Sequence, residues 1–159
     1  MTQFTLPLPT EADTLALGGA LADCMVPGLV VYLSGELGAG KTTLVRGLLR
    51  KLGVSGKVKS PTFALIEVYE VSRLYLYHYD FYRFTGSGSP REFIETGFRE
   101  HFNPQSVCIV ELPEKAAGLP AADLRIELQV PAEADSGRNV SIFADSEAGA
   151  SCLKRFTMT

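Results

Sequence analysis

Apolar residues occur along this chain in short runs and in helical periods, and the two patterns predict alternating strands and helices. Residues 29–33 are an apolar, β-branched run just before a glycine-rich segment, as expected of a buried strand. After Lys41, leucine and valine recur at helical spacing as far as Leu52, and Gly53 follows where helices commonly end. The pattern therefore predicts a strand, a glycine loop and a helix in direct succession.

The rest of the chain continues this alternation. Thr10 is typical of a helix N-cap because acidic residues follow it in the first turn. A capping box at 89–92, with proline at its second position, predicts the start of another helix. Further strands are expected at 64–68, 74–80, 106–110, 124–130 and 140–143, with turns at 70–73 and 135–137.

The glycine loop carries the clearest chemical signal. Residues 35–42, Gly-Glu-Leu-Gly-Ala-Gly-Lys-Thr, match the phosphate-binding P-loop at every fixed position. Its glycines allow the backbone to approach polyphosphate closely, and the helix that follows adds its positive end. Lys41 is expected to reach the β- and γ-phosphates, and the Thr42 hydroxyl to bind Mg²⁺. The predicted fold class is α/β, a three-layer P-loop NTPase fold with a mixed, partly antiparallel sheet, in one domain over residues 1–159.

Composition narrows the function classes. The 159 residues are 46% hydrophobic and 21% charged, and the formal net charge is −3, which argues against a globally basic nucleic-acid binder. No apolar run approaches membrane-spanning length, and the N-terminus lacks the features of a secretory signal. The three cysteines show no paired spacing, which fits a reducing cytoplasm. We therefore expect a cytoplasmic protein without membrane contact.

Two acidic residues follow predicted strands. Glu111 ends the apolar run 106–110, which is the Walker B form that holds Mg²⁺ or its water. Asp80 ends the run 74–80 and could orient a water or the metal; a simple turn aspartate is the other interpretation. Alternation places Tyr75, Tyr77 and Tyr79 on one face of that strand, where they either pack or stack on bases, and packing is the simpler explanation. For His78 alone, core packing is favoured over function.

Residues 60–62, Ser-Pro-Thr, lie where P-loop proteins place a γ-phosphate sensor, although a plain Ser-Pro turn explains them equally well. Together with the P-loop, this segment belongs to a group of motifs that resembles one protein family. The chain resembles the TsaE family, formerly called YjeE, in segments 7–11, 35–43, 58–63, 77–83 and 110–113. The likeness covers nearly the whole chain, and Ser-Pro-Thr and His-x-Asp-x-Tyr-Arg are its specific parts.

The resemblance implies a small bacterial P-loop ATPase needed for N6-threonylcarbamoyladenosine at position 37 of certain tRNAs. It implies catalytic roles for Lys41, Asp80 and Glu111, and Mg²⁺ binding by Thr42 and Glu111. The residues that it implies at the ATP site are Glu11, Leu37, Gly38, Ala39, Gly40, Lys41, Thr42, Thr43, Glu111 and Arg138.

The family also implies partners. Its members act with TsaD and TsaB, by resetting the TsaD–TsaB pair between turnovers, while TsaC makes the threonylcarbamoyl donor; contact with tRNA is expected to be indirect. One departure is Leu112, since the family often has tryptophan there and this chain has none. Leucine keeps the packing but loses stacking and the N–H donor. The 86–89 loop also looks longer than usual.

Three functions remain open on the sequence. The first is a slow ATPase, because only Arg83 and Arg138 could serve as arginine fingers. The second is a nucleotide-gated binding module in which hydrolysis is incidental. The third, a small-molecule kinase, is disfavoured because the residues after Glu111 read as strands with few arginines. A GTPase is disfavoured because the chain lacks an Asn-Lys-x-Asp guanine signature.

Overall fold

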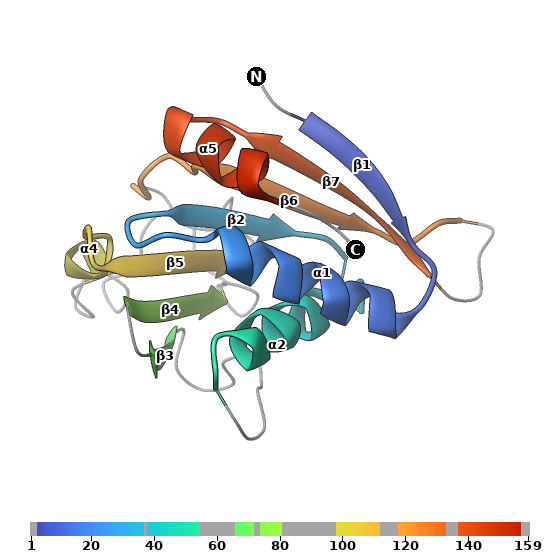
Figure 1. Cartoon of the computed structure of the whole chain (residues 1–159), viewed down its shortest axis with the longest axis horizontal. Helices are drawn as coiled ribbons and strands as arrows, with labels where there is room; N and C mark the ends of the chain where they lie inside the picture. Colours follow the sequence, from blue (N-terminus) through green and yellow to red (C-terminus); the bar gives the residue numbers. More distant parts are fainter. Residues whose placement is uncertain are drawn as a thin grey trace.

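A single sheet organises the chain in the computed structural model (Figure 1). The structure describes residues 3–36, 38–54, 66–71, 74–80, 98–111, 118–132 and 137–156. The strands are β1 (Gln3–Leu8), β2 (Val30–Ser34), β3 (Ile66–Val71), β4 (Leu74–Asp80), β5 (Ser106–Glu111), β6 (Leu124–Gln129) and β7 (Arg138–Ala144). The helices are α1 (Glu11–Cys24), α2 (Lys41–Lys51), α4 (Phe98–His101) and α5 (Glu147–Arg155).

The sheet is mixed, as predicted. Its seven strands run in the order β1-β7-β6-β2-β5-β4-β3. The four central strands are parallel, because β2 pairs in parallel with β5 and β6, and β5 with β4. The outer pairs β3–β4, β6–β7 and β1–β7 are antiparallel, which confirms both predicted hairpins. The C-terminal ends of the parallel strands therefore meet at one edge of the sheet.

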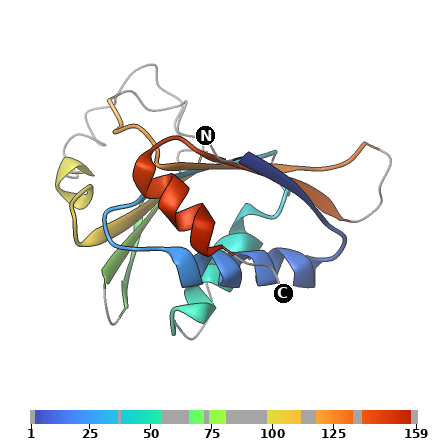
Figure 2. The ribbon, with the colours of Figure 1, turned by 45° about the horizontal axis from the view of Figure 1, so that its top comes forward.

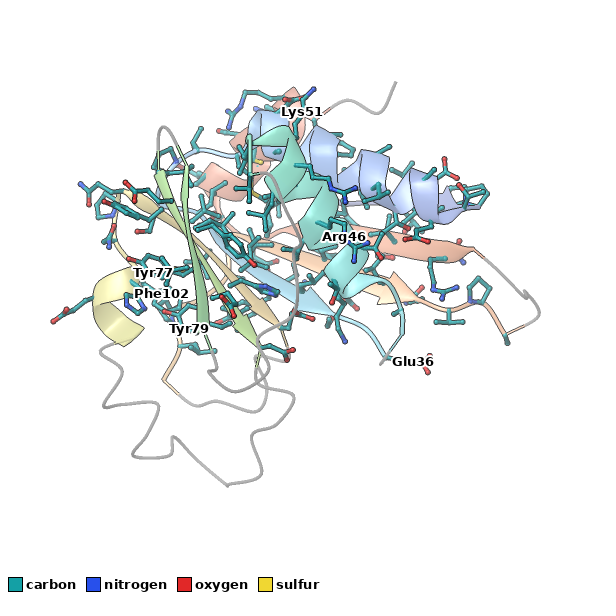
Figure 3. The ribbon with its side chains drawn as sticks, turned by 90° about the horizontal axis from the view of Figure 1, so that it is seen from below. Glu36, Arg46, Lys51, Tyr77, Tyr79 and Phe102 are labelled. Atoms are coloured by element: carbon teal, nitrogen blue, oxygen red, sulfur yellow. The ribbon has the colours of Figure 1, made fainter. Side chains whose placement is uncertain are left out.

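Helices α1, α2 and α5 cover one face of this sheet (Figure 2). Their apolar residues share a core with alternate strand residues such as Val31, Val107 and Ile126. On the opposite face, Tyr77 stacks on His101, which is the last residue of the short α4, with 4.1 Å between the ring centroids. The Tyr79 ring lies 5.6 Å from that of Phe102, and Figure 3 shows these aromatic side chains gathered beside β4. Alternation therefore predicted the tyrosine face of β4 correctly.

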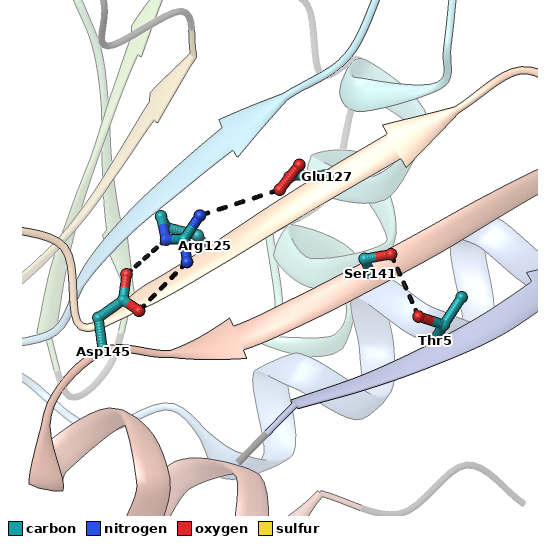
Figure 4. Close-up of polar contacts among 5 residues, drawn as sticks. All are labelled: Thr5, Arg125, Glu127, Ser141 and Asp145. Atoms are coloured by element: carbon teal, nitrogen blue, oxygen red, sulfur yellow. Dashed lines mark hydrogen bonds and ion pairs between the residues drawn. The ribbon is translucent and has the colours of Figure 1, made fainter. Parts of the chain in front are cut away.

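The same opposite face is polar over β1, β7 and β6 (Figure 4). Arg125 bonds Asp145 with 2.5 Å between Nε and Oδ2, and its side chain is 42% exposed. The Thr5 and Ser141 hydroxyls are 3.2 Å apart. Over β1, β7 and β6 the described residues form two layers, the sheet and the helices on one face. The third layer of the predicted three-layer fold is not seen over these strands. The helix predicted from residue 89 begins outside the described residues.

Two elements were not predicted. Strand β1 contains Pro7, which a sheet tolerates only at an edge or a bulge, and β1 is indeed the edge partner of β7. Helix α5 is short, but its N-cap Ser146 accepts a hydrogen bond from the Gly149 N–H at 3.0 Å. The predicted cap of α1 is confirmed, because Thr10 and Asp13 form a capping box. No helix among the described residues has both the length and the apolar character needed to cross a bilayer.

Candidate functional site

The glycine loop leaves β2 at the edge where the parallel strands end. Gly40 is the N-cap of α2 and has a φ of 103°, which side chains rarely adopt. A Cβ at Gly35 would lie 2.7 Å from the Leu128 carbonyl oxygen of β6, so the loop needs glycine there for close approach. No side chain caps the N-terminus of α2, whereas Thr10 and Ser146 cap α1 and α5. A helix N-terminus without a side-chain cap is a common place for an anion to bind.

Lys41 lies at the base of this loop. Its ammonium donates to the Gly35 carbonyl oxygen at 2.5 Å and is 3.5 Å from that of Glu36. Figure 3 shows Glu36 at the outer end of the loop, with Arg46 and Lys51 further along α2. The Lys41 ammonium therefore lies against two carbonyl oxygens of its own loop. Thr42 and Thr43 follow it in the first turn of α2, and Leu37 lies outside the described residues.

Arg138, at the start of β7, makes a further side-chain contact to the loop. Its guanidinium donates to the carbonyl oxygens of Gly38 at 3.0 Å and Ala39 at 3.2 Å. In a trans peptide the C=O of one residue and the N–H of the next point in opposite directions. Binding the Ala39 carbonyl therefore turns the Gly40 N–H away from Arg138. Arg138 therefore lies beside the loop and contacts its backbone; its predicted place at the nucleotide stays a prediction.

Two carboxylates end the neighbouring parallel strands. Glu111 of β5 is in register with Leu33 of β2 on one side and with Asp80 of β4 on the other. All three share the sheet face that carries α1 and α2, since Leu33 belongs to that core. Glu111 is 2% exposed, and its Oε2 is hydrogen-bonded to Nε2 of the fully buried His78. Parallel pairing therefore places Glu111 on the strand next to β2, which leads into the glycine loop, and Asp80 one strand further away.

This donor set fits Mg²⁺ better than a metal held by protein alone. Among the described residues no group of three or more histidine, cysteine or acidic side chains is arranged to hold a metal ion. Mg²⁺ usually takes only one or two protein ligands and completes its shell with phosphate oxygens and water. Glu111 at the end of β5 and Thr42 at the start of α2 are the two residues that could hold it.

Glu11 is the first residue of α1, which packs against the loop. A Cβ at Gly40 would lie 3.7 Å from Cγ2 of Thr14, one turn after Glu11. Glu11 forms an ion pair with Arg46 of α2, with 3.7 Å between Oε1 and Nη1, and its side chain is 71% exposed. An exposed pair of this kind contributes little stability. Sequence reasoning did not single out Arg46, and no local signal pairs residues on two different helices.

Two further predictions fall outside the described residues: the Ser-Pro-Thr segment at 60–62 and Arg83. The same holds for Leu112, which replaces the family tryptophan. The described site therefore consists of the glycine loop, Lys41, Arg138 and the two carboxylates, with Glu11 at its border.

The protein is of the α/β class: helices pack on a mixed sheet, and a P-loop sequence pattern follows the central strand β2. The family described as threonylcarbamoyl adenosine biosynthesis protein TsaE matches residues 8–140. A tRNA threonylcarbamoyladenosine biosynthesis protein TsaE from Haemophilus influenzae is 36% identical over 163 residues, covering 99% of each chain. The protein of that name from Bacillus subtilis is 40% identical over 111 residues, covering 70% of this chain and 67% of its own.

A solved structure agrees with these relatives. The crystal structure of Bacillus subtilis YdiB superposes with a TM-score of 0.73 at 29% identity, covering 96% of this chain and 93% of that one. The chain belongs to the TsaE family, and its role lies in threonylcarbamoyladenosine biosynthesis for tRNA.

Proposed function

We propose that this chain is a slow, Mg²⁺-dependent P-loop ATPase that drives threonylcarbamoyladenosine formation by acting on the TsaD–TsaB pair. The observation that carries the proposal is the junction at the end of β2. An uncapped helix N-terminus, a loop lysine and a buried glutamate on the neighbouring strand meet there. That combination suits a polyphosphate with its metal.

The residues divide the work by position. Lys41 would exchange its loop carbonyls for phosphate oxygens, because an ammonium gains more from an anion than from a neutral acceptor. Thr42 and Glu111 would hold Mg²⁺, which neutralises charge on the phosphates when bound. Asp80, beside Glu111 in the sheet, would orient the attacking water. Arg138 would keep the loop N–H groups directed at the nucleotide.

The contacts of Arg138 support slow turnover. An arginine finger must reach the transferring phosphoryl group, yet the Arg138 guanidinium is engaged by the carbonyls of Gly38, Ala39 and Gly137. This engagement also favours a second candidate, a nucleotide-gated module in which binding of ATP, rather than its hydrolysis, sets the affinity for partners.

The test of the ATPase is Lys41→Ala in the purified protein, with Lys51→Ala as the matched control. Lys51 ends the same helix and pairs with Asp23 at 3.8 Å on the surface. Hydrolysis should fall at least about a hundredfold in the first variant, because the phosphates lose their main charge partner, and should stay near wild type in the second. Unchanged hydrolysis in Lys41→Ala would reject this site.

The two candidates separate in a reconstituted reaction with TsaB, TsaC, TsaD and tRNA under multiple turnover. An Asp80→Ala variant that still binds ATP would be compared with the wild type. If hydrolysis drives the cycle, modification should stop after about one round; if gating suffices, it should continue.

A further inference from the structure

Glu111 has a partner that the proposed function leaves without a role. His78 of β4 is 0% exposed and hydrogen-bonds Oε2 of Glu111 through Nε2. The two residues lie on the same sheet face, because His78 is in register with Ile109, two residues before Glu111 on β5. Strand pairing therefore holds the imidazole beside the carboxylate.

The hydrogen bond between His78 and Glu111 uses only one of the two ring nitrogens of His78. An ionised carboxylate only accepts hydrogen bonds, so Nε2 of His78 carries the proton and donates it. In the neutral ring Nδ1 is then an acceptor, and this buried atom has no hydrogen-bond partner in the part of the chain that the structure describes. A buried acceptor without a hydrogen-bond partner destabilises a fold. Well-packed apolar residues can often replace a buried polar pair without loss of stability. Fold stability therefore does not explain an imidazole at this position.

We propose that His78 is a positioning residue that fixes the orientation of the Glu111 carboxylate for the metal. The terminal torsion of glutamate is broad and nearly two-fold, so an unrestrained carboxylate rotates readily. Donation to Oε2 removes that freedom and assigns Oε1 to the metal or its water. Partners of this kind commonly change metal affinity or activity by about 10- to 100-fold. This inference rests on the proposed Mg²⁺ role of Glu111.

Two carboxamide substitutions test the donor position directly. In His78→Gln the side-chain N–H₂ can reach the place of imidazole Nε2. In His78→Asn the amide ends near the place of Nδ1, too short to reach Glu111. Both variants introduce the same chemical group in a smaller side chain, so they differ mainly in reach.

The measurement is Mn²⁺ binding by electron paramagnetic resonance, in the presence of a non-hydrolysable ATP analogue. We expect His78→Asn to weaken Mn²⁺ binding at least about tenfold and His78→Gln to stay within about threefold of wild type. Binding of the analogue in EDTA should be the same in all three proteins, because the metal-free loop contacts do not involve His78. Equal losses in both amides would overturn the proposal, since reach would then not matter.

Glu111→Gln separates this inference from the proposed function. If Glu111→Gln weakens Mn²⁺ binding while both His78 variants equal wild type, the metal site stands and the role of His78 is wrong. If Glu111→Gln has no effect, the metal assignment fails and the inference fails with it. Thermal unfolding checks that each variant folds. If His78→Asn is less stable, the double variant that combines His78→Asn with Glu111→Gln decides. If it binds Mn²⁺ more weakly than Glu111→Gln alone, His78 does not act through Glu111.

Discussion

The contact between α1 and α2 depends on two glycines, and it yields a prediction with an internal control. A Cβ at Gly18 would lie 2.2 Å from the Leu44 carbonyl oxygen and 2.7 Å from the Leu48 nitrogen. A Cβ at Gly47 would lie 2.2 Å from the Leu15 carbonyl oxygen. These are backbone atoms of the facing helix, so no side-chain rotation can relieve the overlap. Gly18→Ala must therefore push the helices apart.

The size of the effect follows from two opposing contributions. Ordinary contact begins at 3.4 Å, so the helices must separate by roughly 1 Å and lose packing around the crossing. Overpacking of this kind costs about 1–3 kcal/mol, and alanine returns up to about 1 kcal/mol through its higher helix propensity. We expect a net loss of about 1–2 kcal/mol, which corresponds to a fall in Tm of about 2–8 °C for a chain of this size.

Gly19 supplies the control because it is the next residue of the same helix. The nearest atoms to a Cβ at Gly19 belong to the Lys51 side chain, at 3.9 Å and beyond. Gly19→Ala should therefore stabilise by about 0.5–1 kcal/mol. Thermal and urea unfolding of the two variants measure the difference. If Gly18→Ala is as stable as Gly19→Ala, the close helix crossing is wrong. Since α2 carries Lys41, weaker binding of ATP is also expected in Gly18→Ala alone.

Two further predictions concern the loop and the opposite sheet face. Arg138→Gln should weaken binding of an ATP analogue about tenfold, because the Gly38 and Ala39 carbonyls lose charged donors, whereas Arg125→Gln on β6 should not; equal affinities would contradict the loop contact. Burial lowers the pKa of His101 from its ordinary value of 6.5, so the unfolded chain takes up this proton first and stability falls as the pH drops below about 6.5. His101→Asn, whose amide can still hydrogen-bond the Tyr79 hydroxyl, should lose less Tm between pH 7.5 and 5.5 than wild type. Identical losses would show that another group causes the acid sensitivity.

Local signals explain what could be predicted from the sequence. The β2 strand, the glycine loop and α2 each carry their own pattern of residues, and they form as expected. The cap of α1 likewise depends on residues three apart in the chain. β1 escaped prediction because Pro7 argues against a strand, although Phe4, Leu6 and Leu8 alternate with other residues. Its pairing with β7 is set by residues 130 or more positions away. Helix α5 was missed because its nine residues make only about two and a half turns, too few for a clear helical period.

The contacts between site residues depended on pairings that no local pattern contains. Arg138 lies 99 residues after Ala39, and only the antiparallel return of β7 beside β6 brings it to the loop. His78 and Glu111 are 33 residues apart. Each could be assigned to a strand from the sequence, but their contact requires β4 to lie next to β5 in this register. For this reason His78 was interpreted as core, which describes its burial but misses its partner.

The core and the site are set by the same alternation of residues. Val107, Ile109 and Glu111 share one face of β5, and the first two are buried beneath the helices. Because side chains alternate along a strand, a register shift of one residue would turn Glu111 to the opposite face and bring Val110 in its place. The apolar contacts of Val107 and Ile109 therefore hold the carboxylate on the side where the glycine loop and α2 begin, and the position of this acid follows from how the sheet packs.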